Sequence, residues 1–193
     1  MLRKIIGTLA VTALLTTTAT SVSANTIEEI KKRAAEINEL KALVQSADPA
    51  LRLAAIDAMQ NSEDLAMREL AFSAGVNASD ESVVALTIRN KFSELDNFIV
   101  SFNSEPEDEE GKKIYKSIGG RLNVEIGEYN KNKGVFRNST NYSSSSGNST
   151  LSGLNLLLGT AYCHGEFRLA DDLLFKGTVT CSKQQFPATI SIF

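Results

Sequence analysis

The residues that could do chemistry in this chain are few, and they lie close together near the C-terminus. His164 is the only histidine among the 193 residues, so a metal site built from several histidines is excluded. Glu166 lies two residues on, on the same face of an expected strand, where the two side chains could form a pH-sensitive pair. The adjacent Asp171 and Asp172 could act as paired carboxylates, but a hairpin tip favours them as turn formers. We therefore predict no catalytic residue, no cofactor site and no metal ligand.

The two cysteines, Cys163 and Cys181, are predicted to form a disulfide. They are symmetric about Asp172, so an antiparallel hairpin with its tip at 171–173 places them opposite each other. The predicted pairs on that face are Leu169 with Phe175, Phe167 with Gly177, Gly165 with Val179, and Cys163 with Cys181. This face is apolar and the other is mostly polar, so register, alternation and cysteine pairing agree. A catalytic dithiol is disfavoured because the two cysteines lack the C-x-x-C spacing.

The C-terminal part of the chain has the two-residue period of β-strands. Alternation over 122–126 predicts a half-buried strand, and alternation over 186–192 predicts the last one. Residues 138–153 are rich in Ser, Thr and Asn, which predicts an exposed loop, with a polar strand as the alternative. Its N-x-Ser/Thr patterns begin at Asn138, Asn141 and Asn148.

A sixteen-residue repeat precedes this part. Asp48, Asp64 and Asp80 fall in one column, where each carboxylate can cap the N-terminus of a helix. Apolar residues follow at offsets of three, six and eight, which predicts a helix of three turns and a short connection in each copy. The third helix is expected to run on to about Phe102.

The first copy, with Pro49 directly after the capping Asp48, resembles one helix of a HEAT-like repeat. The resemblance extends over 48–93 and implies stacked helices that present a protein-binding surface. The alternative is that the three apolar stripes simply build a small helical core. The candidate partner surface consists of Leu51, Arg52, Met67, Arg68 and Val83.

Residues 26–46 are predicted to form a further helix. Its apolar residues follow coiled-coil spacing until Lys41 interrupts the row. The helix is expected to pack on the next element, and the alternative is self-association, which would make the protein an oligomer.

The N-terminus has the order of a secretory signal peptide. Arg3 and Lys4 precede an apolar stretch, and small residues end at Ala24, which predicts cleavage there; an uncleaved anchor is the alternative. The apolar stretch is short for a bilayer span, and we expect no integral span after cleavage. A periplasmic or secreted location follows, and there a disulfide is permitted. The formal net charge of −3 disfavours binding to nucleic acid.

Together these patterns predict an α+β protein in four parts. A signal peptide (1–24) precedes a helical bundle of HEAT-like helices (25–103), an acidic linker (104–113) and a small antiparallel β domain (114–193), a sandwich or half-barrel. We expect a non-catalytic binding or scaffold protein of the cell envelope, whose helical repeat contacts a protein partner. The alternative is a small-molecule or glycan-binding protein with a pocket in the β domain. Its lining would be Phe136, Tyr142, Tyr162, Phe167, Phe175 and Phe186.

Overall fold

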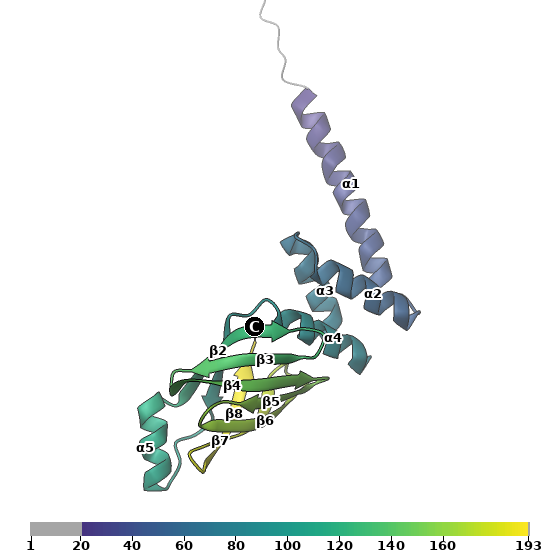
Figure 1. Ribbon diagram of the computed structural model, residues 1–193. Helices are drawn as coiled ribbons and strands as arrows, with labels where there is room; N and C mark the ends of the chain where they lie inside the picture. The colour runs from purple at the N-terminus through teal and green to yellow at the C-terminus, as the bar shows by residue number, and fades with distance from the viewer. Residues whose placement is uncertain (1–20, 193) are drawn as a thin grey trace, which may run out of the picture. The chain divides into compact units, whose positions relative to one another are not determined.

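A computed structural model describes residues 21–192 of the chain, with side chains from residue 26 onward. The predicted signal peptide lies outside the described residues, apart from positions 21–24, which begin the first helix. Within residues 21–192, four helices precede eight strands, and a fifth helix lies between the first two strands (Figure 1). The helices are α1 (Ser21–Val44), α2 (Pro49–Gln60), α3 (Leu65–Val76), α4 (Glu81–Phe92) and α5 (Glu109–Ile118). Of the helices described, none is long and apolar enough to cross a membrane.

The chain divides into two units, Met1–Glu39 and Leu40–Phe193. The first contains most of α1, and the second contains α2 to α5 and every strand. The contacts of α2 to α5 with the strands lie within the second unit.

The sixteen-residue repeat and its capping residues are confirmed. Asp48 Oδ1 accepts a hydrogen bond from the backbone N–H of Ala50 at 2.9 Å, and Asp64 and Asp80 cap α3 and α4 in the same way. Each carboxylate satisfies N–H groups that have no partner inside the helix. The three helices that begin at these caps are each 12 residues long.

The expectation that the third helix runs on to Phe102 is wrong. Helix α4 ends at Phe92, and Asn97–Phe102 forms strand β1. Phe98 and Phe102 are four residues apart, which fits a helix, but alternate residues of this segment are buried, as in a strand. Pairing with two neighbouring strands decides between the two periods, and this pairing is a tertiary property.

The acidic segment 104–113 is only partly a linker. Asp108 accepts a hydrogen bond from the backbone N–H of Gly111 at 2.7 Å and caps α5, whose first turn contains Glu109 and Glu110. Negative side chains are stabilised at a helix N-terminus by the helix dipole, so the acidic run begins a helix.

The strands form a closed antiparallel barrel, where a sandwich or half-barrel was expected. The strands are β1 (Asn97–Phe102), β2 (Arg121–Asn130), β3 (Val135–Thr140), β4 (Ser143–Ser152), β5 (Asn155–Gly159), β6 (Cys163–Leu169), β7 (Phe175–Cys181) and β8 (Gln184–Ser191). Each strand pairs with the next, and β1 pairs with β8 to close the ring. The expectation of an exposed loop over 138–153 is wrong. The alternative, a polar strand, is correct, because this segment supplies β4 and the end of β3.

The predicted hairpin is confirmed in register and in cross-link. Cys163 pairs with Cys181 and Leu169 with Phe175, as the symmetry about Asp172 requires. The two sulfur atoms are bonded at 2.08 Å. Leu173 adopts a left-handed conformation at the tip, with φ of 62°.

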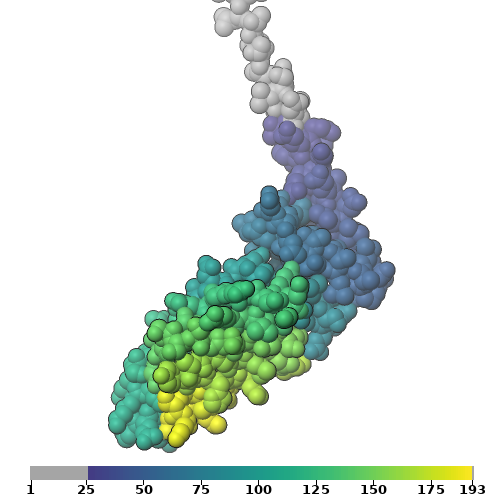
Figure 2. Space-filling model, viewed as in Figure 1, coloured from purple at the N-terminus to yellow at the C-terminus, as the bar shows by residue number. Residues whose placement is uncertain are grey.

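Aromatic side chains fill the barrel and close its ends. At one end Phe92 of α4 enters the core, with its ring centroid 5.9 Å from Phe98 and 6.1 Å from Phe175. At the other end Phe102 stacks on Phe186 at 4.5 Å and meets Tyr115 of α5. Figure 1 shows α4 and α5 at opposite ends of the barrel, and Figure 2 shows the outer surface of the strands from the same side. The barrel is therefore a packed body rather than an open cup.

Candidate functional site

The residues of the predicted partner surface do not share one surface. Leu51 on α2 is 42% exposed, whereas Met67 and Val83 are buried. The aligned apolar positions therefore face the helical core in the second and third copies, as the alternative of a small helical core requires. Only Leu51 of these three side chains is available to a partner.

Arg52 and Arg68 serve the repeat itself. Arg52 donates to the backbone oxygen of Ser46 at 2.6 Å and lies 3.6 Å from a carboxylate oxygen of Asp80. Arg68 makes the same kind of contacts. It donates to the backbone oxygen of Ser62 at 2.9 Å and pairs with Glu94, which follows α4. Each arginine thus ties the start of its own helix to a later part of the repeat.

Large exposed apolar side chains are found on the helices. Ile27 and Ile30 lie on α1, where Ile30 is 62% exposed, and Leu65 at the start of α3 is 61% exposed. Together with Leu51 they make four of the seven such residues in the described part of the chain. Leu65 was missed by the sequence analysis, because it directly follows the capping aspartate, at an offset without an apolar pattern.

His164 and Glu166 lie on the outer face of β6, as predicted. They border a shallow hollow of about 370 Å³ together with Thr178, Thr180 and Gln185. Within residues 21–192 no three side chains from His, Cys, Asp and Glu gather as a metal site would require. Two potential ligands alone do not make a metal site.

Asp171 and Asp172 lie at the hairpin tip and form the turn. Asp172 Oδ1 accepts from the backbone N–H of Leu174, and Oδ2 lies 2.6 Å from Lys176 Nζ. The hydrogen bond from Lys176 lowers the pKa of Asp172. These contacts of Asp172 are those of a turn-forming residue.

A polar network joins the helices to the barrel. Asp57 of α2 accepts a hydrogen bond from Asn90 of α4 at 3.0 Å and lies 3.5 Å from Lys131 in the β2–β3 turn. Burial acts to raise the pKa of Asp57, but the hydrogen bond from Asn90 and the charge of Lys131 outweigh it and lower that pKa. Tyr129 donates to the backbone oxygen of Arg89 at 3.2 Å, and burial raises its pKa to about 12. The repeat and the barrel are thus connected by both polar and apolar contacts.

The six aromatic residues expected to line a pocket do not surround one. The four phenylalanines are buried in the packed interior. Tyr162 is exposed, and its ring lies 6.3 Å from that of Tyr142. This arrangement disfavours a ligand cavity inside the barrel.

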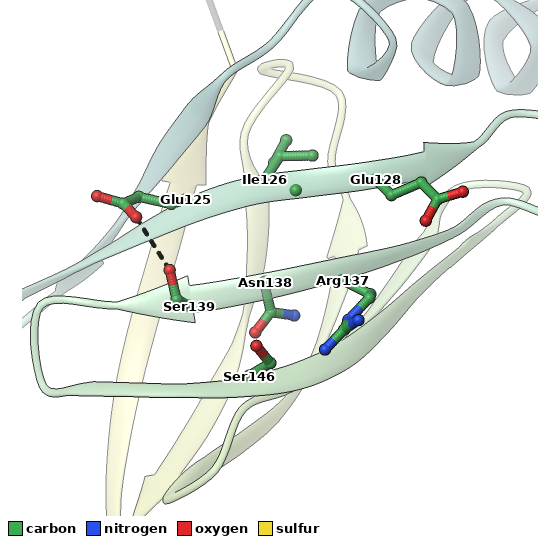
Figure 3. Close-up of a pocket in the computed structure, with 8 residues that line it drawn as sticks. Glu125, Ile126, Glu128, Arg137, Asn138, Ser139 and Ser146 are labelled. Carbon is green, nitrogen blue, oxygen red and sulfur yellow. Dashed lines mark hydrogen bonds between the residues drawn. The ribbon is translucent and has the colours of Figure 1, made fainter.

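A hollow of about 330 Å³ lies on the barrel wall where β3 passes between β2 and β4. Its lining residues are Glu125, Ile126, Gly127, Glu128, Arg137, Asn138, Ser139 and Ser146 (Figure 3). Asn138 Nδ2 donates to Ser149 Oγ at 2.6 Å and to the backbone oxygen of Gly159 at 3.1 Å. Among the N-x-Ser/Thr asparagines, Asn138 is buried, whereas Asn141 and Asn148 are exposed.

The sequence analysis missed this hollow as a site. The available signal was Gly127, where the alternation of 122–126 ends and a strand irregularity begins. Comparison of the chain with protein-family models, curated proteins and solved structures finds no match.

Proposed function

We propose that the protein is an exported, non-catalytic binding protein whose helical repeat contacts a protein partner. The observation that carries this proposal is the exposure of large apolar side chains on α1, α2 and α3, which supply four of the seven in the described part of the chain, the other three lying in the barrel. Single exposed apolar residues are common on protein surfaces, so their concentration on neighbouring parts of the sequence is what matters. Full burial of a leucine in an interface contributes about 1.5–3 kcal/mol.

The internal bonding of the repeat supports the same role. Three short helices of equal length are held by their own caps and by Arg52 and Arg68, so the exposed faces lie on an ordered support. Stacked helices of the HEAT type bind proteins through such faces. In this proposal the barrel supports the repeat, which packs against it through α4.

Export rests on the signal-peptide pattern, and the disulfide is consistent with it. A Cys163–Cys181 bond persists in an oxidising compartment, such as a bacterial periplasm or the cell exterior. We therefore propose a periplasmic or secreted location and a partner in the cell envelope.

Capture of the partner tests this proposal. The mature protein is crosslinked in native envelope extract, and bound proteins are identified by mass spectrometry. Leu51→Ser and Leu65→Ser remove exposed apolar contacts on α2 and α3, and Leu157→Ser, at a residue that is 47% exposed on β5, is the matched control. We expect a stoichiometric partner with the wild type and the control, and reduced capture with both helix variants. Equal capture by all variants, or no partner at all, would contradict the proposal.

Self-association through α1 is a separate proposal. The exposed Ile27 and Ile30 could be buried against a second copy of the same helix. Light scattering after gel filtration distinguishes the two, because Ile30→Ser would then convert a dimer to a monomer. A monomeric wild type at high concentration would refute self-association and leave the hetero-partner proposal standing.

A further inference from the structure

Three hairpin turns lie at one end of the barrel, because consecutive strands run in opposite directions. The β3–β4 turn contains Tyr142, the β5–β6 turn contains Tyr162, and the β7–β8 turn consists of Ser182 and Lys183. Ser182 and Lys183 both adopt left-handed conformations, with φ of 48° and 73°, which suits the tight two-residue turn of a hairpin.

The rings of Tyr142 and Tyr162 meet across these turns. Their centroids are 6.3 Å apart and their planes are inclined at 79°, so the edge of one ring faces the other. The hydroxyl of Tyr142 lies 3.2 Å from Ser182 Oγ, and the backbone N–H of Ser182 donates to the backbone oxygen of Tyr162 at 3.1 Å. The Cys163–Cys181 bond joins the residues directly beside Tyr162 and Ser182. The contact between the two rings is therefore supported by bonds among all three turns.

Both rings of this pair can be reached from solvent. Tyr162 is 59% exposed and Tyr142 is half-buried. The other two tyrosines of the chain, Tyr115 and Tyr129, have their ring centroids 6.3 Å and 6.1 Å from phenylalanine rings of the core. A phenylalanine ring has no hydroxyl group, so these contacts do not bring two phenols together. Tyr142 and Tyr162 are thus two accessible phenols in contact.

Two phenols in contact have a defined oxidative chemistry. Removal of one electron and the hydroxyl proton from a tyrosine gives a phenoxyl radical, whose unpaired electron is shared with the ring carbons next to the carbon that bears oxygen. Two such radicals couple through these carbons. We propose that Tyr142 and Tyr162 form a modification site, at which an enzyme of the peroxidase class joins the two rings as dityrosine.

The reaction balances with hydrogen peroxide as the terminal oxidant. Each tyrosine gives up one electron and its hydroxyl proton, and together these reduce one hydrogen peroxide to two water molecules. A carbon–carbon bond forms between the rings, and the hydrogen displaced from each ring moves to the oxygen, which restores both hydroxyl groups. The cross-linked chain is therefore lighter than the original chain by two hydrogen atoms.

The arrangement favours coupling within one molecule. Groups held in contact react as if they were highly concentrated, with effective molarities of about 10⁵–10⁸ M for the best-oriented pairs. Coupling between two copies requires radicals on separate molecules to meet in solution. The product would tie the β3–β4 turn to the β5–β6 turn, which the disulfide already connects to the β7–β8 turn. The oxidising location belongs to the proposed function, whereas the reactivity of the pair depends on its geometry alone.

Oxidation of the dilute mature protein by a haem peroxidase and hydrogen peroxide, under conditions that couple free tyrosine, tests the site. We expect dityrosine fluorescence in the monomer, with a yield per chain that does not change with protein concentration. No Lys or Arg occurs over 138–167, so trypsin leaves both tyrosines on peptide 138–168, which should be lighter by two hydrogen atoms after reduction of the disulfide. Chymotrypsin cleaves after the leucines between the two tyrosines and should release two linked peptides. Absence of dityrosine, or dityrosine in dimers alone, would overturn the proposal.

Conservative variants assign the link to this pair. Tyr142→Phe and Tyr162→Phe keep a ring at each position but remove one phenol, so each should abolish the intramolecular product. Tyr115→Phe and Tyr129→Phe are matched controls, because these rings contact phenylalanines, and both should give the wild-type yield. A wild-type yield from Tyr142→Phe or Tyr162→Phe, or loss of the product in a control whose spectra show the native fold, would overturn the assignment.

Discussion

Phe92 connects the helical repeat to the barrel, and its removal should destabilise both. The residue ends α4, is fully buried, and places its ring among Phe98, Phe136 and Phe175, with centroids 5.9–6.1 Å away. Phe92→Ala would leave a cavity at the end of the barrel, which its rigid strands cannot easily close. The change would lower the stability of both the helical repeat and the barrel, which belong to the same unit, 40–193.

The expected cost follows from the buried ring. Truncation of a buried phenylalanine to alanine costs about 3–5 kcal/mol, and aromatic pairs add about 0.5–1.5 kcal/mol beyond their buried area. With aromatic neighbours on three strands, we expect a loss of about 4 kcal/mol for Phe92→Ala. Typical domains have a total stability of about 5–15 kcal/mol, so this one change would remove a large part of it.

Denaturant unfolding at fixed pH, with the disulfide intact, measures this loss. Far-UV circular dichroism follows the helices, and tyrosine fluorescence follows the barrel, since the chain has no tryptophan. Phe72→Ala on α3, where the ring is half-buried, is the control, with an expected loss of about 1–2 kcal/mol. A loss below about 1 kcal/mol for Phe92→Ala, or separate transitions for the two signals, would refute the view that α4 closes the barrel.

Four further predictions concern local features. Replacement of both Cys163 and Cys181 by alanine should lower stability by about 3 kcal/mol, measured by urea unfolding, and an unchanged midpoint would refute the stabilising role of the cross-link. Asp64→Ala should cost about 1 kcal/mol through loss of the α3 cap, whereas Asp171→Ala at the exposed hairpin tip should cost little. Because the folded-state pKa of Asp57 is lowered, its contribution is present above its ordinary pKa and is lost as pH falls; Asp57→Ala should therefore destabilise more at neutral pH than in acid. Because the folded-state pKa of Tyr129 is raised from 10.0 to about 12, its contribution is present below pH 10 and is lost as pH rises through about 12; Tyr129→Phe should flatten the alkaline fall in stability, and an identical fall would count against the assignment.

The predictions that rest on residues close together in the chain agree best with the structure. The pairing of Cys163 with Cys181 follows from a hairpin in which strand alternation and turn position agree over a short stretch. The caps at Asp48, Asp64 and Asp80 likewise depend only on hydrogen bonds within a few residues. Such features involve neighbours in the chain, so sequence spacing describes them directly.

Segments with an ambiguous pattern were assigned incorrectly. Phe98 and Phe102 satisfy a helical and a strand period at once, and only pairing with β2 and β8 selects the strand. The Ser- and Asn-rich residues 138–153 have little strand propensity of their own. They become β4 and part of β3 because the neighbouring strands supply hydrogen bonds and a buried face.

The candidate sites depended most on the tertiary structure. Met67 and Val83 occupy the same kind of repeat position as Leu51, but helix packing buries the first two and exposes the third. The hollow beside Asn138 arises from register shifts on two different strands, which no short pattern encodes. A site of this kind becomes visible only when the strands are paired.

The sequence by itself determined that helices come before a β part, and it determined the helix caps, the repeat period and the disulfide hairpin. Each of these depends on residues that are close in the chain, where spacing and hydrogen-bonding chemistry act directly. The tertiary structure alone decided that the strands close into a barrel, that Phe92 and α5 seal its ends, and that a hollow lies on the wall beside β3. Closure requires β1 to pair with β8 across most of the domain, and that pairing depends on the combined geometry of all eight strands.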